Sequence, residues 1–203
     1  DKEFDAKVFR TKNRPIASGK VSIKLGVFYS IFLCLLALLV LLNFNLFTII
    51  LALASMPLAF TYPLMKRFTY WPQLFLGITF NYGIILGWTA INGQIDVLPL
   101  ILYFGAIFWT LGYDTIYGYQ DIKDDEVIGL KSTSIKFKHN PKLFIFLCYL
   151  FLIFSIYLAG YLSEFNNYFY IFMSLPIIQI FFYQVKAFDS RNSTKCLKIF
   201  KSN

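Results

Sequence analysis

The chain has 203 residues, of which 58% are hydrophobic, and its mean hydropathy is +0.60. A soluble domain of this length is closer to half apolar, so the composition argues against an ordinary soluble protein. The net charge of +8 comes from 19 lysines and arginines against 11 acidic residues, but the sequence contains no soluble basic domain to which a nucleic acid could bind. The three cysteines have no spacing typical of a disulfide framework or a zinc site.

Six stretches of the chain contain no charged residue. Each is long enough for a helix that crosses the hydrocarbon core of a bilayer, which takes about 17 to 25 residues. A soluble helical protein would need a polar stripe on each helix, and these stretches have none. In chain order they are Leu25–Asn45, Leu46–Met65, Phe68–Ile95, Val97–Tyr113, Leu143–Ser163 and Phe165–Val185. The sequence therefore predicts an all-α, polytopic membrane bundle with six transmembrane helices.

The lysines and arginines lie in only four segments of the chain. They precede the first stretch, separate the second from the third and the fourth from the fifth, and follow the sixth. The connections at the opposite end of the predicted bundle carry only Asp96 and Glu164. Since cytoplasmic loops carry the excess of positive charge, we expect both chain ends on the cytoplasmic side or its equivalent. This rule, together with anionic lipid, accounts for the net charge.

The acidic residues form two clusters on the cation-rich side. One holds Asp1, Glu3 and Asp5, and the other holds Asp114, Asp121, Asp124, Asp125 and Glu126. The spacings 1 and 5, and 114, 121 and 125, each fall on one helical face if the segments are helical. Asp114 directly follows an uncharged stretch, and a carboxylate at that depth is a functional-site hypothesis. Converging carboxylates suit Mg²⁺ shared with a diphosphate, although ordinary solvated loop charges are the alternative.

Two sequence motifs match a known family. The first reads Asp1-Lys-Glu-Phe-Asp5, followed by Arg10-Thr-Lys-Asn-Arg14-Pro-Ile-Ala-Ser-Gly19. It resembles the Asn-Asp-x-x-Asp-x-x-x-Asp and Arg-Thr-x-x-Arg-Pro-Leu-x-x-Gly runs of the UbiA superfamily of intramembrane prenyltransferases. Asp1 and Asp5 match the last two aspartates of that run. The leading Asn-Asp is missing, so we expect that the chain begins inside the motif.

The second motif runs from Tyr113 to Thr133 and ends in Lys131-Ser132-Thr133. The segments Tyr62–Thr69 and Cys196–Asn203 also resemble the family, and most closely its 4-hydroxybenzoate polyprenyltransferase branch. The resemblance covers residues 1–203 and implies a single integral-membrane domain, part of a nine-helix bundle. By that count we expect a domain truncated at both ends, without the first two helices and the ninth.

The resemblance implies transfer of a polyprenyl group from polyprenyl diphosphate to 4-hydroxybenzoate in ubiquinone synthesis, with Mg²⁺ as cofactor. It implies a multi-pass protein of a bacterial or mitochondrial inner membrane, with the aspartate motifs on the cytoplasmic or matrix side. The expected metal ligands are Asp1, Asp5, Asp114, Asp121 and Asp125. The expected binding residues for diphosphate or carboxylate are Arg14, Lys66, Arg67, Lys131, Tyr113 and Tyr117. Among all of these, the expected catalytic residues are Asp114, Asp121 and Arg67.

Three alternatives remain open at this point. The first is another branch of the superfamily with a haem, homogentisate or naphthoate acceptor, against which Lys66-Arg67 and Lys131-Ser132-Thr133 argue. The second is a transporter, which predicts charges within spans or inverted repeats, and the sequence shows neither. The third is a non-catalytic scaffold, which would not need two aspartate clusters on one side. For Arg67 alone, an interfacial anchor is the alternative to an anion-binding role.

Overall fold

The structure, a computed structural model, describes residues 2–7 and 11–203. Within these residues all regular secondary structure is helical, which confirms the predicted fold class. The elements in chain order are α1 (Lys2–Lys7), α2 (Ile23–Leu41), α3 (Leu46–Thr61), the 3-10 turn η1 (Tyr62–Leu64), α4 (Met65–Phe68), α5 (Pro72–Phe80), α6 (Gly83–Asn92), α7 (Val97–Gly118), α8 (Ile122–Ile128), α9 (Thr133–Lys136), α10 (Pro141–Leu162), α11 (Asn167–Ile178), the π-helix η2 (Gln179–Val185) and α12 (Ser193–Phe200).

Six helical segments in the described part of the chain are long and apolar enough to cross a membrane, as predicted. They are Ile23–Leu41, Leu46–Phe68, Pro72–Asn92, Val97–Gly118, Pro141–Leu162 and Asn167–Val185. Two of the predicted bounds differ in a way that matters for the site. The fourth helix continues past Tyr113 to Gly118, so Asp114 lies inside the span, one turn before its end. The third span begins at Pro72, after a non-helical link.

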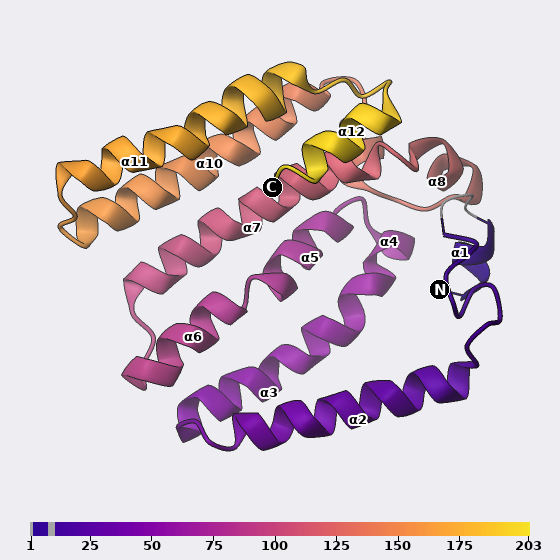
Figure 1. The fold of residues 1–203 in the computed structure, drawn as a ribbon, viewed down its shortest axis with the longest axis horizontal. Coiled ribbons are helices and arrows are strands. Elements are labelled where there is room, and N and C mark those ends of the chain that lie inside the picture. The colour runs from indigo at the N-terminus through magenta and orange to yellow at the C-terminus, as the bar shows by residue number, and fades with distance from the viewer. Residues whose placement is uncertain (1, 8–10) are drawn as a thin grey trace.

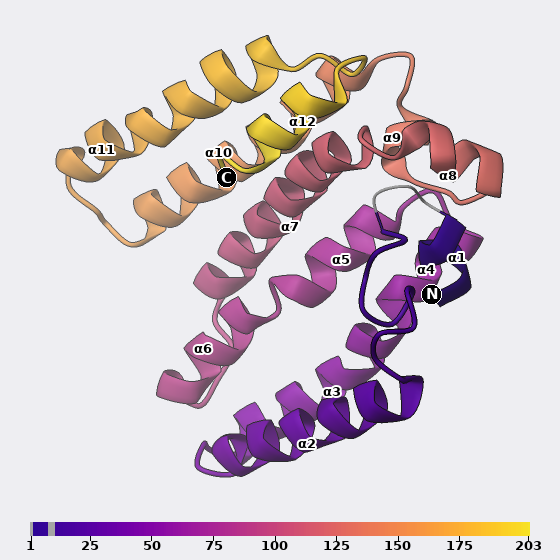
Figure 2. The same ribbon diagram turned by 45° about the vertical axis from the view of Figure 1, so that its right-hand side comes forward.

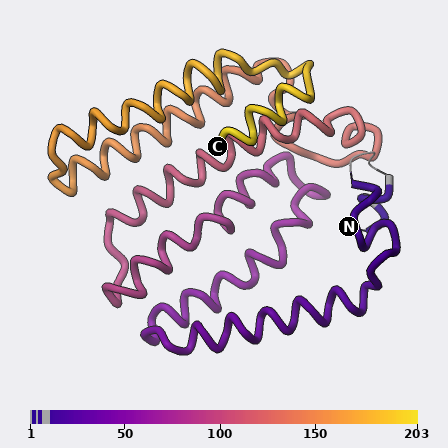
Figure 3. The backbone as a smooth tube through the Cα atoms, viewed as in Figure 1, coloured from indigo at the N-terminus to yellow at the C-terminus, as the bar shows by residue number. Residues whose placement is uncertain are grey.

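The spans lie side by side in the order of the sequence (Figure 1). Helix α7 occupies the middle, packed against α5 on one side and α10 on the other. Helices α2 and α3 form one flank and α10 and α11 the other, as the backbone trace also shows (Figure 3). Helices α4, α8 and α9 and the start of α12 gather at one end of the bundle, the end that bears the cationic segments.

Glycines allow α7 to approach its neighbours closely. A Cβ atom at Gly105 would lie 2.6 Å from the Cβ of Ser155 on α10, and one at Gly112 would lie 2.9 Å from the ring of Tyr149. On the other side, a Cβ at Gly77 of α5 would lie 2.9 Å from the carbonyl oxygen of Ile107. Small residues are typical of helix contacts in membranes, where van der Waals packing replaces the hydrophobic effect. These contacts fix the position of α7, which carries Asp114, between α5 and α10.

The third span is interrupted between α5 and α6, which the uncharged stretch did not predict. The side-chain amide of Asn81 lies at the break and donates to the carbonyl oxygens of Gly77 and Ala106, at 2.8 and 3.2 Å. It also donates to the hydroxyl of Thr110 on α7, at 2.8 Å. A helix break at membrane depth is tolerated when polar side chains from neighbours bond the freed backbone groups. Asn81 has this role.

Helix α12 folds back from the charged end and runs along α7 (Figure 2). Its inner face is buried, with Cys196 0% and Ile199 1% exposed. Beyond the helix, the side-chain oxygen of Asn203 accepts from the indole N–H of Trp109 at 3.0 Å and from the amide of Gln184 at 3.1 Å. The last segment of the chain is therefore tied to α7 and to η2.

Candidate active site

A pocket of about 440 Å³ opens at the charged end of the bundle. One part of its wall comes from the loop after α1, the end of the second span and the start of α5. The other part comes from the end of α7, from α8 and from the residues just before α9. The polar and aromatic residues that line it are Arg14, Tyr62, Lys66, Gln73, Asp114, Tyr117, Asp125, Lys131 and Ser132. Two carboxylates and three cations thus line one pocket.

The two carboxylates come from separate helices. Asp114 lies on α7, and Asp125 lies on α8 after a turn at 119–121. The expectation that 114, 121 and 125 share one continuous helical face is therefore wrong, because α7 ends at Gly118. At that point a Cβ atom would lie 2.4 Å from the hydroxyl oxygen of Ser134, so only glycine allows the α9 segment to pack there. Asp121 directly precedes the first residue of α8 and is not among the residues that line the pocket.

The cation-bearing segments are tied to each other. The backbone N–H of Lys131 donates to the carbonyl oxygen of Lys66 at 2.8 Å. The ammonium of Lys131 donates to the carbonyl oxygen of Phe68 at 3.2 Å and lies 5.6 Å from the ring centroid of Tyr70. These contacts hold Lys66 and Lys131 on the same wall of the pocket. Arg67, by contrast, is exposed and is not among the lining residues.

Lys66 connects the two acidic clusters. Its side chain is half-buried, and the carboxylates of both Asp5 and Asp125 attract its ammonium, while Arg67 and Arg14 repel it. Asp5 belongs to the first aspartate motif and Asp125 to the second. The fold therefore brings the two motifs to the same group of cations, although four spans separate them in the sequence.

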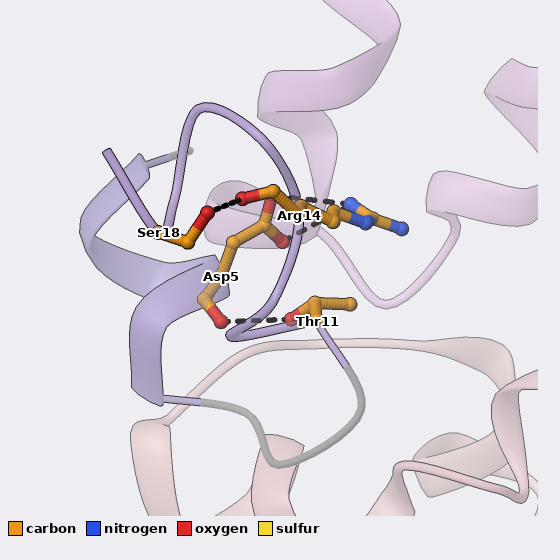
Figure 4. A network of polar contacts seen from close by, with 4 residues as sticks. All are labelled: Asp5, Thr11, Arg14 and Ser18. Atoms are coloured by element: carbon orange, nitrogen blue, oxygen red, sulfur yellow. Dashed lines mark hydrogen bonds and ion pairs between the residues drawn. The ribbon is translucent and has the colours of Figure 1, made fainter. Parts of the chain in front are cut away.

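Asp5 lines a neighbouring pocket of about 450 Å³, and Arg14 lines both pockets. The guanidinium Nη1 of Arg14 donates to the two carboxylate oxygens of Asp5, both at 3.1 Å (Figure 4). The backbone carbonyl of Asp5 accepts from the hydroxyl of Thr11, and that of Arg14 accepts from Ser18. The Arg14 side chain is 54% exposed and that of Asp5 is 21% exposed, so solvent reaches the guanidinium more than its partner. Arg14 is the cation that the two pockets share.

Gln73 holds the segment 131–133 in place, a role that the sequence patterns missed. Its side chain is 7% exposed, and its oxygen accepts from the backbone N–H of Thr133 at 3.0 Å. The hydroxyls of Thr115 and Thr133 lie 2.6 Å apart, so the same segment also bonds to α7. The available signal was a polar amide directly after Pro72 at the start of an uncharged stretch. The sequence did not indicate that Thr133 is the partner of Gln73, because the two residues are far apart in the chain.

Tyr113 and Tyr117 are differently placed. Tyr117 lines the pocket, and its ring lies 4.4 Å from that of Phe200 on α12. Tyr113 is not among the lining residues and packs between Trp109 and Phe200, at 5.3 and 5.7 Å between ring centroids. Phe200 is a second residue that the site analysis of the sequence did not single out. Its ring packs against Tyr117, a residue of the pocket wall.

The remaining predicted metal ligand, Asp1, lies outside the described residues. Among the residues described, no three His, Cys, Asp or Glu side chains come close enough to hold a metal ion by themselves. Mg²⁺ is usually bound by one or two carboxylates together with substrate phosphates, rather than by a cage of protein ligands. Asp114 and Asp125, with cations beside them for the phosphate oxygens, fit this mode of binding.

The fold and site define a polytopic membrane protein with a pocket lined by carboxylates and cations at the charged end of its helices. The chain belongs to the UbiA prenyltransferase family, whose sequence profile matches residues 1–203. It is 52% identical over 143 residues to the mitochondrial 4-hydroxybenzoate polyprenyltransferase of Rattus norvegicus, an alignment that covers 70% of this chain and 38% of the rat protein. It is 41% identical over 206 residues to 4-hydroxybenzoate geranyltransferase 2 of Lithospermum erythrorhizon, covering 100% of this chain and 66% of that protein.

The mitochondrial 4-hydroxybenzoate polyprenyltransferase of Arabidopsis thaliana is 49% identical over 148 residues, which is 71% of this chain and 36% of the plant protein. The chain thus spans about a third to two thirds of the length of these relatives. No solved structure matches it. The family and its membrane-embedded fold agree with the resemblance that the two aspartate motifs indicated.

Proposed function

We propose that the protein transfers a polyprenyl group from a polyprenyl diphosphate to an aromatic acid, with 4-hydroxybenzoate as the acceptor. The observation that supports this most directly is the pocket that Asp114 and Asp125 line together with Arg14, Lys66 and Lys131. Carboxylates and cations in this arrangement suit a diphosphate accompanied by a divalent metal. The names of the relatives supply the acceptor.

Asp114 and Asp125 are the residues that would hold Mg²⁺, with Asp121 and the first motif as further ligands in our proposal. The metal would neutralise the leaving diphosphate and so lower the barrier to breaking the allylic C–O bond. Lys66 and Lys131 bind the phosphate oxygens from the wall that they share. Arg14, which already lines this pocket, joins them by exchanging Asp5 for a phosphate oxygen.

An apolar groove of about 810 Å³ between α2 and α3 is suited to the prenyl tail. Its lining runs along the hydrocarbon region, from Val27 to Leu41 on α2 and from Ala52 to Phe60 on α3. Phe60 precedes Tyr62, which lines the site pocket, by two residues. A tail in this groove would leave the diphosphate at the charged end, and the apolar surroundings would keep water from the allylic carbon.

The distribution of lysines and arginines supports a proposal for the side of the membrane on which the site lies. In the described part of the chain, the lysine- and arginine-bearing segments lie at the end that holds the pocket, and the far connections carry Asp96 and Glu164. By the positive-inside rule, we therefore propose that the site lies at the cytoplasmic face, or at the matrix face of a mitochondrial inner membrane.

The test is prenylation of 4-hydroxybenzoate by membranes that carry the protein, with polyprenyl diphosphate and a Mg²⁺ titration. We expect product that rises with Mg²⁺ and disappears on chelation. Homogentisate, a dihydroxynaphthoate and haem are tested as alternative acceptors, each in a separate reaction. Preferential prenylation of one of these would assign the protein to another branch of the family, and activity that persists unchanged under chelation would contradict the metal role.

A further inference from the structure

A second polar pocket lies at the charged end, between α12 and the end of the last span. Its volume is about 350 Å³, and it shares no lining residue with the candidate active site. The residues that matter for its chemistry are Lys195, Lys198, Asn192, Thr194 and Tyr183. Nothing in the proposed prenyl transfer uses this pocket.

The two lysines are held in place by the helix that carries them. Lys195 and Lys198 are three residues apart and therefore share one face of α12. The adjoining face is buried in the bundle through Cys196 and Ile199, and Ile199 also lines the pocket. The side-chain oxygen of Asn192 accepts from the backbone N–H of Lys195 at 3.0 Å and so fixes the start of the helix.

This pair of ammonium groups lacks a protein counter-ion among the described residues. Neither Lys195 nor Lys198 forms an ion pair there. Asp189 is the acidic residue of this segment, and its carboxylate accepts from the backbone N–H of Arg191 at 3.0 Å. Lys186 precedes the lining residue Ala187 in the chain, and its ammonium lies 5.9 Å from the ring centroid of Phe182. The pocket therefore presents the positive charge of Lys195 and Lys198 on a helix whose start is held by Asn192 and whose buried residues pack into the bundle.

The depth of the pocket indicates what kind of anion it suits. Tyr183 lies two residues before the end of the last span, the level at which tyrosines concentrate in membrane proteins. In the same span, Phe182 directly precedes Tyr183 and Ile178 lies about one turn deeper, and the two side chains are 66% and 52% exposed. A ligand with a phosphate at the interface and acyl chains below it matches both surfaces. A soluble anion would use only the lysines.

We propose that the pocket between α12 and η2 is a binding site for the headgroup of an anionic phospholipid, with Lys195 and Lys198 on its phosphate and the acyl chains along Ile178 and Phe182. Basic pockets beside transmembrane helices on the cytoplasmic or matrix side are suited to such lipids. The site is separate from the diphosphate pocket, so it stands whether or not the proposed reaction is correct.

The experiment titrates the detergent-solubilised protein with dioleoyl phosphatidylglycerol or dioleoyl phosphatidylcholine, and counts bound lipids by native mass spectrometry. We expect retention of one phosphatidylglycerol in preference to phosphatidylcholine. In the variant K195Q/K198Q the affinity for phosphatidylglycerol should fall about thirtyfold, because each lysine near an anionic surface contributes roughly a factor of five. The variant K195R/K198R should retain binding.

The matched control is K123Q/K142Q, which removes the same charge from exposed lysines of the same end outside the pocket. It should bind like the unmodified protein. Equal losses in the two double variants would reduce the effect to net charge and overturn the proposal, as would equal binding of the two lipids. An excess of inorganic phosphate that displaces the lipid completely would identify a site for a free anion instead. Should K195Q/K198Q fail to fold, the single variants K195Q and K198Q carry the same comparison.

Discussion

Lys66 is the side chain at which the charges of the candidate site meet. Asp5 and Asp125 attract its half-buried ammonium from two distant parts of the chain, and Arg14 and Arg67 repel it. A cation between carboxylates offsets their mutual repulsion, which allows them to stay ionised close together. The same ammonium is positioned for an anion before any substrate arrives, so little further ordering is required on binding.

Asp114→Asn tests the proposed metal role directly. The substitution keeps the volume of the side chain and removes the charge, so the fold should be retained. We expect prenyl transfer per folded molecule to fall on the order of a thousandfold, the effect of several kcal/mol in the barrier. Activity is measured across a Mg²⁺ titration and normalised to folded protein. Near-normal turnover at ordinary Mg²⁺, or loss of thermal stability in place of activity, would exclude Asp114 as a metal ligand.

For the neighbouring residues Lys66 and Arg67 we predict different effects of substitution on KM. Lys66 lines the pocket, whereas Arg67 is exposed outside it. Lys66→Met should raise KM for the prenyl diphosphate about ten- to a hundredfold, as expected for one hydrogen bond between charged groups. Arg67→Met, which removes the same charge, should change KM by less than about threefold, as expected for an interfacial anchor. Steady-state kinetics of the two variants decide, and similar changes in both would contradict the assignment.

At the scale of elements, the sequence predicted the spans but not the breaks within them. Absence of charge over helical lengths marked the spans, because lipid tolerates no other pattern. The interruption at Asn81 and the packing of α12 could not be predicted, since each depends on a partner on α7, Thr110 in one case and Trp109 in the other. The site was predicted as a set of residue types near one another. Its separation into two pockets with Arg14 between them required the fold.

Helix α12 should affect the site through Phe200, whose ring rests on Tyr117 and Tyr113. Phe200→Ala removes this support, and the loss of aromatic contacts worth about 0.5–1.5 kcal/mol each predicts a fall in kcat/KM of about fivefold or more. Phe200→Tyr should retain most activity. Ile91→Ala, at an 87% exposed position at the far end of the bundle, is the control. Normal kinetics in Phe200→Ala would show that α12 packs on the site without influencing it.

The contact between α7 and α10 can be tested with a matched pair of glycines. Gly105→Ala places a Cβ 2.6 Å from that of Ser155 and should destabilise the protein by about 1–3 kcal/mol. Gly87→Ala meets nothing within 4 Å and should be neutral or slightly stabilising. Unfolding in a denaturing detergent gives both values. The double variant Gly105→Ala/Ser155→Gly should recover stability, and failure to do so would place the cost elsewhere than at this contact.

On the scale of the whole molecule, the cationic segments lie at one end of the bundle, and the exposed apolar side chains lie along its flanks. Helix α2 has no buried residue, and α11 likewise exposes most of its apolar side chains, so the flanks of the molecule are suited to lipid. Buried polar bonds such as those of Gln73 and the paired threonines lie at the charged end. The same end carries the candidate site and the proposed lipid pocket. Orientation in the membrane therefore decides which compartment supplies every polar ligand.

Single cysteines at Ser18, Asn92 and Asn192 test this orientation, because all three positions are exposed and lie outside the spans or at their ends. A membrane-impermeant maleimide added from the compartment that faces the site should label positions 18 and 192, and position 92 should label from the opposite side. The native thiols should stay silent. Cys148 is buried and Cys34 lies on the lipid-facing α2, while burial raises the pKa of Cys196 to about 11, which leaves almost no reactive thiolate at neutral pH. Labelling of all three positions from one side would contradict the topology of six spans.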